Sequence, residues 1–166
     1  MNGILAVECD GLVTNVSGLY PFFMENIPET PGRRGAVAII VQDGRMLVIR
    51  RSRHVIAPLA YCFPGGGIED GETEEEAVAR EVHEEIGVSI RPLRRLWECV
   101  TAWKVHLAWW LADMDRVAAT VPNPREVESI HWFTPREMAG LPDLLDSNRQ
   151  FLELIEKGEI RLYESV

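Results

Sequence analysis

The sequence contains little cysteine, and its three cysteines are widely separated. Cys9, Cys62 and Cys99 lie in a chain of 166 residues, and no pair has the C-x-x-C spacing of a zinc or redox site. Secreted domains that depend on disulfides carry many more cysteines, usually in even numbers. This usage argues against a disulfide framework and a zinc site, and it predicts a cytoplasmic protein with reduced thiols.

The sequence also lacks a long hydrophobic run and an excess of positive charge. Its apolar stretch at residues 106–112 is far shorter than the ~18 residues that a membrane-spanning helix needs. The first eight residues include no lysine or arginine, so we expect neither a signal peptide nor a membrane partner. The 26 acidic and 17 basic residues give a net charge of -9, and such a surface repels polyanions. We therefore expect no nucleic-acid polymer as a partner.

Residues 1–33 differ from the rest of the chain, and we interpret them as an N-terminal extension. Within the extension, residues 4–8 and 12–16 are candidates for the two strands of a small hairpin. Residues 27–34 contain two prolines and a glycine and are typical of a linker. The main domain is then residues 34–166, which is long enough to bury a core of its own.

In the main domain, the hydrophobic runs and the helix start and stop signals predict an order of β-hairpin, loop, helix, strands and helix. We expect strands at residues 36–41, 46–50, 61–63, 94–101, 104–112 and 129–133. After the third of them, Thr73 and Glu76 form the T-x-x-E pattern of a capping box, and Gly87 is the stop signal of the helix. Ser147 is the expected cap of a last helix that runs through Glu156. This order favours a sheet sandwiched between helices.

The central helix carries a high concentration of acids. Residues 66–88 contain nine acids and one arginine. At about 100° per residue, Glu81, Glu84 and Glu85 fall on one face of the helix, and Arg80 can pair with Glu84 one turn away. In a cleft with an effective dielectric constant of 20, two charges about 5 Å apart repel by roughly 3 kcal/mol. On a solvated helix face the repulsion is tolerable, but in a cleft the cluster needs a cation. Oxygen ligands without histidine or cysteine select Mg²⁺, Mn²⁺ or Ca²⁺ over zinc.

A glycine-rich loop at residues 64–67 precedes this helix, and together they match a known pattern. The sequence reads Gly66-x5-Glu72-x7-Arg80-Glu81-Val82-x-Glu84-Glu85-x-Gly87-Val88. It resembles the whole Nudix box, G-x5-E-x7-R-E-U-x-E-E-x-G-U, in which U is apolar. The resemblance implies an α/β Nudix fold, an α/β/α sandwich with a mixed β-sheet and a loop-helix-loop Nudix box at residues 66–88. It also implies an enzyme that uses a metal ion to hydrolyse a diphosphate bond in a nucleoside diphosphate derivative.

The family pattern assigns roles to the residues of the box. The cofactor would be Mg²⁺, with Mn²⁺ as an alternative. Its ligands would be the carboxylates of Glu81, Glu84 and Glu85 and the carbonyl of Gly65. In this pattern Arg80 orients the glutamates for catalysis, and Glu72 supports the loop.

The family often adds a catalytic acid from a later loop. Residues 124–133 resemble that segment, and Glu126 matches the acid and metal ligand best, with Glu128 as the second candidate. A nearby carboxylate can take the proton of the attacking water. We favour Glu81 as this base over Glu126 and leave the assignment open.

The substrate is a small nucleotide in this interpretation. Arg50 and Arg51 are candidates to bind its phosphates, since the planar guanidinium suits phosphate oxygens. Their spacing to residues 63–65 resembles that of the MutT branch, which hydrolyses oxidised purine nucleoside triphosphates. Residues 103–105 lack the proline of the ADP-ribose branch and the tyrosine of the dinucleoside-polyphosphate branch. We therefore expect a pyrophosphohydrolase of (d)NTPs or modified (d)NTPs.

Three alternatives stay open. The first is a nucleotide-sugar or ADP-ribose pyrophosphatase with the same chemistry. The second is a non-catalytic nucleotide-sensing module that has kept the fold. The third concerns assembly, because the aromatic run at residues 20–23 is a candidate contact for a homodimer or for packing on the main domain.

Overall fold

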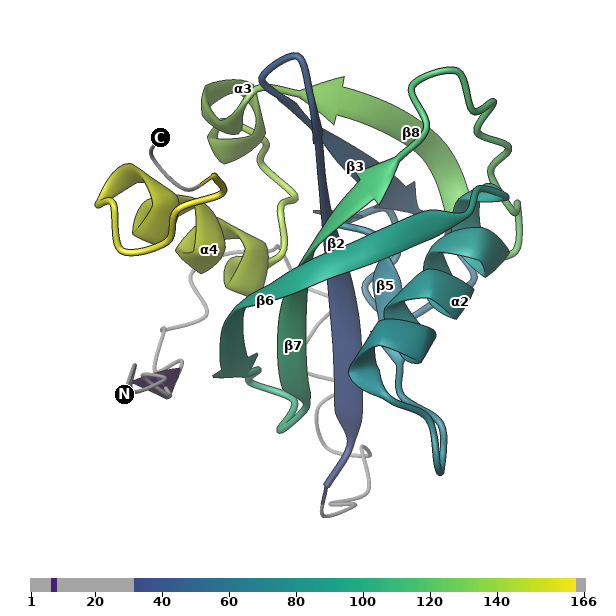
Figure 1. Cartoon of the computed structure of the whole chain (residues 1–166), viewed down its shortest axis with the longest axis horizontal. Coiled ribbons are helices and arrows are strands. Elements are labelled where there is room, and N and C mark those ends of the chain that lie inside the picture. The colour runs from purple at the N-terminus through teal and green to yellow at the C-terminus, as the bar shows by residue number, and fades with distance from the viewer. Residues whose placement is uncertain (1–6, 9–31, 164–166) are drawn as a thin grey trace.

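The computed structural model describes residues 7–8 and 32–163 (Figure 1). The hairpin expected at residues 4–8 and 12–16 lies outside them, apart from strand β1 (Val7–Glu8). This short strand pairs in parallel with the end of β6 (Ile90–Val100). Within the described part of the chain, no helix is long and apolar enough to cross a membrane.

A mixed sheet of eight strands forms the middle of the fold, and β2 (Arg34–Gln42) belongs to both of its halves. In one half, β2 pairs in parallel with β7 (His106–Met114), which pairs antiparallel with β6. In the other half, β2 continues through a tight turn into β3 (Arg45–Arg51), and β3 pairs antiparallel with β8 (Val127–Phe133). Two short strands, β4 (Tyr61–Cys62) and β5 (Gly65–Gly67), pair with β3 and β2 respectively.

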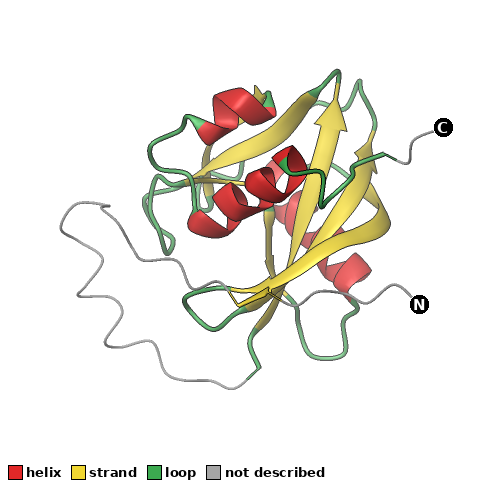
Figure 2. Cartoon of the chain, turned by 90° about the vertical axis from the view of Figure 1, so that its left-hand side faces the viewer, coloured by secondary structure: helices red, strands yellow, loops and turns green. Residues whose placement is uncertain are grey.

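Helices cover this sheet from two sides (Figures 1 and 2). Helix α2 (Glu74–Ile86) lies on one side. Helices α3 (Pro135–Ala139) and α4 (Asp146–Glu156) lie on the other. The arrangement confirms the expected α/β/α sandwich with a mixed sheet.

Each side of the sheet has its own hydrophobic core. On the α2 side, the helical stripe packs on strand residues such as Leu47 and Ile49. The stripe consists of Val78, Val82 and Ile86, all fully buried. On the other side, the rings of Trp109 and Phe151 stack with their centroids 4.8 Å apart. The first core fixes the height and rotation of α2, and therefore the direction in which its acidic face points.

Helix α2 begins and ends at the predicted start and stop signals. The hydroxyl of Thr73 accepts a hydrogen bond from the backbone N–H of Glu76, and the Glu76 carboxylate accepts one from the backbone N–H of Thr73. At the other end, Gly87 has a φ of 72°, a left-handed conformation that glycine adopts without strain. Both predictions are confirmed.

The last part of the chain differs from expectation. Ser147 was the expected cap, but α4 begins at Asp146 after Leu145, with no side-chain cap. The residue before this helix is bound to strand β4 instead, because the backbone N–H of Leu145 donates to the carbonyl of Tyr61 at 3.1 Å. Helix α3 was not predicted, although Thr134 and Glu137 form the same capping box as α2. The predicted first residues of strands β6, β7 and β8 are displaced by two to four residues, and the predicted last residues by two at most.

Candidate active site

The acidic face of α2 is directed towards the glycine-rich strand β5. The carboxylate of Glu85 is almost completely buried, with 4% of the residue exposed. The side chain of Glu81 is 13% exposed, and that of Glu84, one turn from Arg80, is 49% exposed. The predicted face therefore presents its three carboxylates at three depths, from the protein interior to the solvent.

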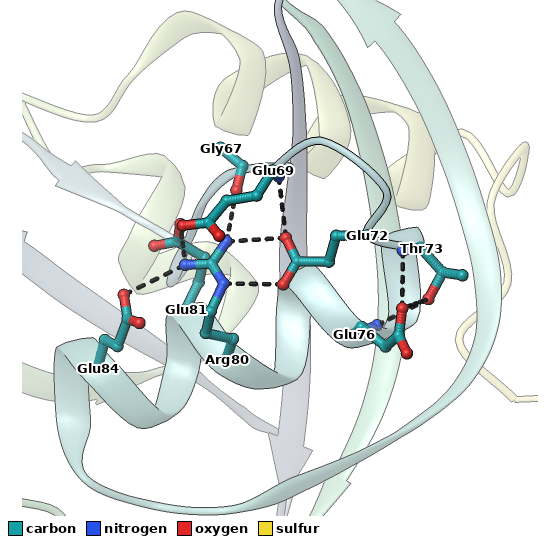
Figure 3. Close-up of polar contacts among 8 residues, drawn as sticks. All are labelled: Gly67, Glu69, Glu72, Thr73, Glu76, Arg80, Glu81 and Glu84. Carbon is teal, nitrogen blue, oxygen red and sulfur yellow. Dashed lines mark hydrogen bonds and ion pairs between the residues drawn. The ribbon is translucent and has the colours of Figure 1, made fainter.

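Arg80 joins this face to the loop before the helix (Figure 3). Its guanidinium forms ion pairs with Glu81 at 2.9 Å and with Glu84 at 3.2 Å, as the i, i+4 spacing predicted for the latter. It also binds Glu72 at 2.8 Å and donates to the carbonyl of Gly67 at 2.8 Å. Since Arg80 contacts both carboxylates and the loop, it sets their relative positions.

Glu72 has the supporting geometry expected of it. Its carboxylate accepts hydrogen bonds from Arg80 and from the backbone N–H of Glu69 (Figure 3). These hydrogen bonds, that of Arg80 foremost, lower the pKa of Glu72 to about 2. The carboxylate is therefore held ionised within the turn that leads into α2.

Glycine is required where β5 approaches the helix. A Cβ on Gly66 would overlap the carboxylate of Glu81. Gly65 has a φ of 147°, and a Cβ there would overlap the carbonyl oxygen of Ala36. The absence of side chains allows the Gly65 backbone N–H to donate to Oε2 of Glu85 at 2.9 Å. The glycine-rich strand thus brings its backbone polar groups directly against the acidic face.

Burial makes the ionised form of these carboxylates unfavourable. The pKa of Glu85 rises from its ordinary value of 4.5 to about 8, chiefly because the group is buried. The Gly65 N–H and the charge of Arg51 oppose this rise, while the charges of Glu81 and Glu126 add to it. The pKa of Glu81 is also raised by burial, against the effect of Arg80.

The charge of Glu126 helps to raise the pKa of both Glu81 and Glu85, so Glu126 lies within electrostatic reach of both helix acids. Glu126 is half-buried and precedes β8, whereas Glu128 is exposed. Of the two candidates for the later-loop acid, the structure thus brings Glu126 to the acidic face.

The two candidate phosphate-binding arginines point to opposite sides of the sheet. The pairing of β3 with β8 passes from Arg50↔Ser129 to Arg51↔Val127 and skips Glu128, which is the extra residue of a β-bulge. The Arg51 guanidinium lies 3.9 Å from the sulfur of Cys62, on the α2 side. Its positive charge opposes the rise in the pKa of Glu85.

The Arg50 guanidinium lies instead over the ring of Tyr61, 5.5 Å from its centroid. Tyr61 packs against the core on the α3 and α4 side. The structure therefore brings Arg51, and not Arg50, to the carboxylates.

The chemistry of the site suits a hard divalent cation. Its donors are carboxylate oxygens and a peptide backbone, with no histidine or thiolate among them. A cation would favour the ionised form of Glu85 and Glu81 that burial opposes. Among the described residues, no three histidine, cysteine, aspartate or glutamate side chains are arranged to hold a metal ion as they stand. Two of the carboxylates, Glu81 and Glu84, are paired with Arg80.

A sandwich of this kind, with an arginine-held acidic helix against a glycine-rich strand, defines a class of cation-dependent sites for phosphate chemistry. Comparison with known proteins gives the particular family. A family model described as "NUDIX domain" matches residues 32–155. The chain therefore belongs to the Nudix family, whose hydrolases generally need divalent metal ions.

Relatives in this family carry several different names. The chain is 35% identical over 109 residues to an NAD-capped RNA hydrolase NudC of Chromobacterium violaceum, which covers 64% of this chain and 40% of the relative. It is 48% identical over 52 residues to an ADP-ribose pyrophosphatase of Methanocaldococcus jannaschii, which covers 30% of this chain and 29% of the relative. The chain spans less than half of the length of the NudC relatives that it matches.

A solved structure supports the fold. The MutT protein of Methanosarcina mazei superimposes with a TM-score of 0.66 at 24% identity, over 79% of this chain and 97% of that chain. At this identity the likeness shows the fold alone.

Proposed function

We propose that this protein hydrolyses a diphosphate bond in a nucleoside diphosphate derivative with the help of a divalent cation. The observation that carries the proposal is the buried carboxylate of Glu85, which accepts a hydrogen bond from the Gly65 N–H and whose pKa is raised by burial and by the charges of Glu81 and Glu126. Burying several acids together is unfavourable unless a cation joins them. The family membership of the chain supports the same chemistry.

The cation would be Mg²⁺, with Mn²⁺ as the alternative. The residues that would hold it are Glu81, Glu84, Glu85, Glu126 and the carbonyl of Gly65. When bound, such an ion neutralises charge on phosphate oxygens and acidifies a water molecule. Arg80 keeps Glu81 and Glu84 on the helix face through its ion pairs.

The bond change itself is a simple hydrolysis. The oxygen of a water molecule bonds to one phosphorus, the bridging P–O bond breaks, and the proton of the water passes to a carboxylate. Glu81 is the favoured base because its carboxylate lies against the backbone of Gly66 on the acidic face. Glu126 is the alternative base. Arg51, whose charge acts on Glu85, would bind a phosphate oxygen.

Two substrate classes fit this chemistry. The spacing from Arg51 to the glycine-rich strand favours (d)NTPs or modified (d)NTPs. The NudC and ADP-ribose pyrophosphatase names of the relatives favour instead two nucleosides, or a nucleoside and a sugar, joined by a diphosphate. The expectation that no nucleic-acid polymer binds stays a prediction, because capped RNA is in the name of the NudC relatives.

The test is a product screen with Mg²⁺. The panel holds (d)NTPs, oxidised dGTP, NAD, ADP-ribose, nucleotide sugars, dinucleoside polyphosphates and an NAD-capped RNA. Pyrophosphate from one or two triphosphates would support the first class, and nucleoside monophosphate from ADP-ribose or NAD the second. Activity should be lost in Glu85→Gln and retained in Glu75→Gln, which changes an exposed acid in the first turn of α2.

A folded protein that binds Mg²⁺ and nucleotides but leaves every member of the panel intact would overturn the hydrolase proposal. That result would favour the nucleotide-sensing module.

A further inference from the structure

The segment that carries Glu126 is folded tightly around Asn123. The backbone N–H groups of Glu126 and Val127 both donate to the carbonyl of Asn123, at 2.9 and 2.7 Å. The backbone N–H of Asn123 donates in turn to the carbonyl of Glu85 at 2.8 Å. The loop is therefore docked on the turn of α2 that carries the most buried acid of the site.

A second anchor holds the other side of this segment. Ser52, which is 1% exposed, follows the end of β3. Its backbone N–H donates to the carbonyl of Glu126 at 2.8 Å, and its hydroxyl donates to the carbonyl of Arg125 at 2.7 Å. The backbone of the loop is thus fixed between α2 and β3, and only the side chain of Glu126 is left to be oriented.

The orientation of the Asn123 carboxamide is determined by its partners. The backbone N–H of Arg125 donates to Oδ1 of Asn123 at 3.2 Å. Because a backbone N–H only donates, the carbonyl oxygen of the carboxamide must face it. The NH₂ group then faces Glu126 and donates to its Oε1 at 3.2 Å.

This hydrogen bond is to one carboxylate oxygen. A glutamate at the end of a loop has three side-chain torsions, and a fixed donor to one of its carboxylate oxygens restricts them. The charge of Glu126 reaches both Glu81 and Glu85 in this orientation.

We propose that Asn123 is a positioning residue, which ties Glu126 to the Glu85 turn of α2 and orients its carboxylate into the cation site. This role rests on the proposed function, in which Glu126 helps to hold the cation. Asn123 itself touches neither the substrate nor the cation in this scheme. The sequence offered only the turn signal of its Asn-Pro dipeptide, which says nothing about a carboxylate three residues later.

Asn123→Ser separates the two roles of the side chain. A serine hydroxyl can still accept from the Arg125 N–H as in a local turn, but it is too short to donate to Glu126. Neither residue is charged, so the charge of the site is unchanged. Asn123→Thr has the same chemistry and serves as a second variant if the first one is unstable in thermal unfolding.

The experiment measures Mn²⁺ affinity by calorimetry for the wild type, Asn123→Ser, Glu126→Gln and the double variant. Groups that support a metal ligand change metal affinity by about 10- to 100-fold when removed. We expect Asn123→Ser to lose affinity by about tenfold, with folding retained. If it acts through Glu126, the double variant should bind no more weakly than Glu126→Gln.

The outcomes are distinguishable. Wild-type affinity in Asn123→Ser, or losses that multiply in the double variant, would overturn the role of Asn123 and leave the proposed function standing. Wild-type affinity in Glu126→Gln would overturn the role of Asn123 as well, because the loop acid would then take no part in the cation site. A wild-type protein that binds no Mn²⁺ would overturn the proposed function and this role together.

Discussion

The metal-free protein should lose stability as the pH rises, because of one buried carboxyl group. Burial raises the pKa of Glu85 from 4.5 to about 8. Between these values the folded protein keeps a proton that the unfolded chain releases, so the free energy of unfolding falls with increasing pH. The window of about 3.5 pH units, at about 1.36 kcal/mol each, is worth about 5 kcal/mol. The loss is absent below pH 4.5 and complete above pH 8.

Glu85→Gln isolates this effect. The amide has no charge to bury, and its carbonyl oxygen can still accept from the Gly65 N–H. We would measure chemical unfolding of both proteins in EDTA at intervals from pH 5 to 8.5. Burial and the charge of Arg50 lower the pKa of His131, so its contribution to stability rises with pH, but it is common to both proteins and cancels.

The stability of the wild type relative to Glu85→Gln should fall by several kcal/mol across this range. Mg²⁺ should restore stability to the wild type at pH 8 and do less for the variant, because a cation favours the ionised carboxylate. Parallel stability profiles for the two proteins would refute the argument that Glu85 is buried without a compensating charge.

Three further predictions test the glycine-rich strand, the two arginines and the cap of α2. Gly66→Ala should reduce kcat on the order of 100-fold, because its Cβ would displace the nearest carboxylate, whereas Gly67→Ala has open space and should retain activity. Arg51→Ala should raise KM on the order of tenfold and more than Arg50→Ala does; an equal effect would contradict the division of the two arginines between the faces. Thr73→Ala should cost about 1 kcal/mol of stability, or a few degrees in Tm, with kcat at 25 °C unchanged.

Helix α2 was predictable because its signals are local. The capping box of Thr73 and Glu76, the stop at Gly87 and the stripe at every fourth residue lie within one short window of sequence. Helix periodicity alone then places the acids on one face. The identity of the site followed from the same window, because the glycine-rich segment precedes the helix directly.

The depth of each acid was not predictable from that window. Glu81, Glu84 and Glu85 share a face, but it is Glu85 that accepts a hydrogen bond from the backbone of β5, which is placed by its pairing with β2. That pairing joins residues about 30 positions apart, and its register appears nowhere in the pattern of the box.

Tertiary packing also decided which arginine meets the carboxylates and where the last helix begins. Arg50 and Arg51 are consecutive residues of β3, so their side chains face opposite sides of the sheet. Strand alternation alone does not tell which of these two sides is covered by α2, because that depends on how the helices pack on the sheet. In the same way, α4 begins where β4 binds the chain at Leu145, and not at the serine that its sequence offers as a cap.

The most direct test of the account is whether the acidic face of α2 binds a divalent cation. We would titrate Mn²⁺ into the wild type, Glu81→Gln and Glu75→Gln and follow free Mn²⁺ by electron paramagnetic resonance. We expect the wild type and Glu75→Gln to bind Mn²⁺, and Glu81→Gln to bind it at least tenfold more weakly. Equal Mn²⁺ binding by all three proteins, or none by the wild type, would contradict the account.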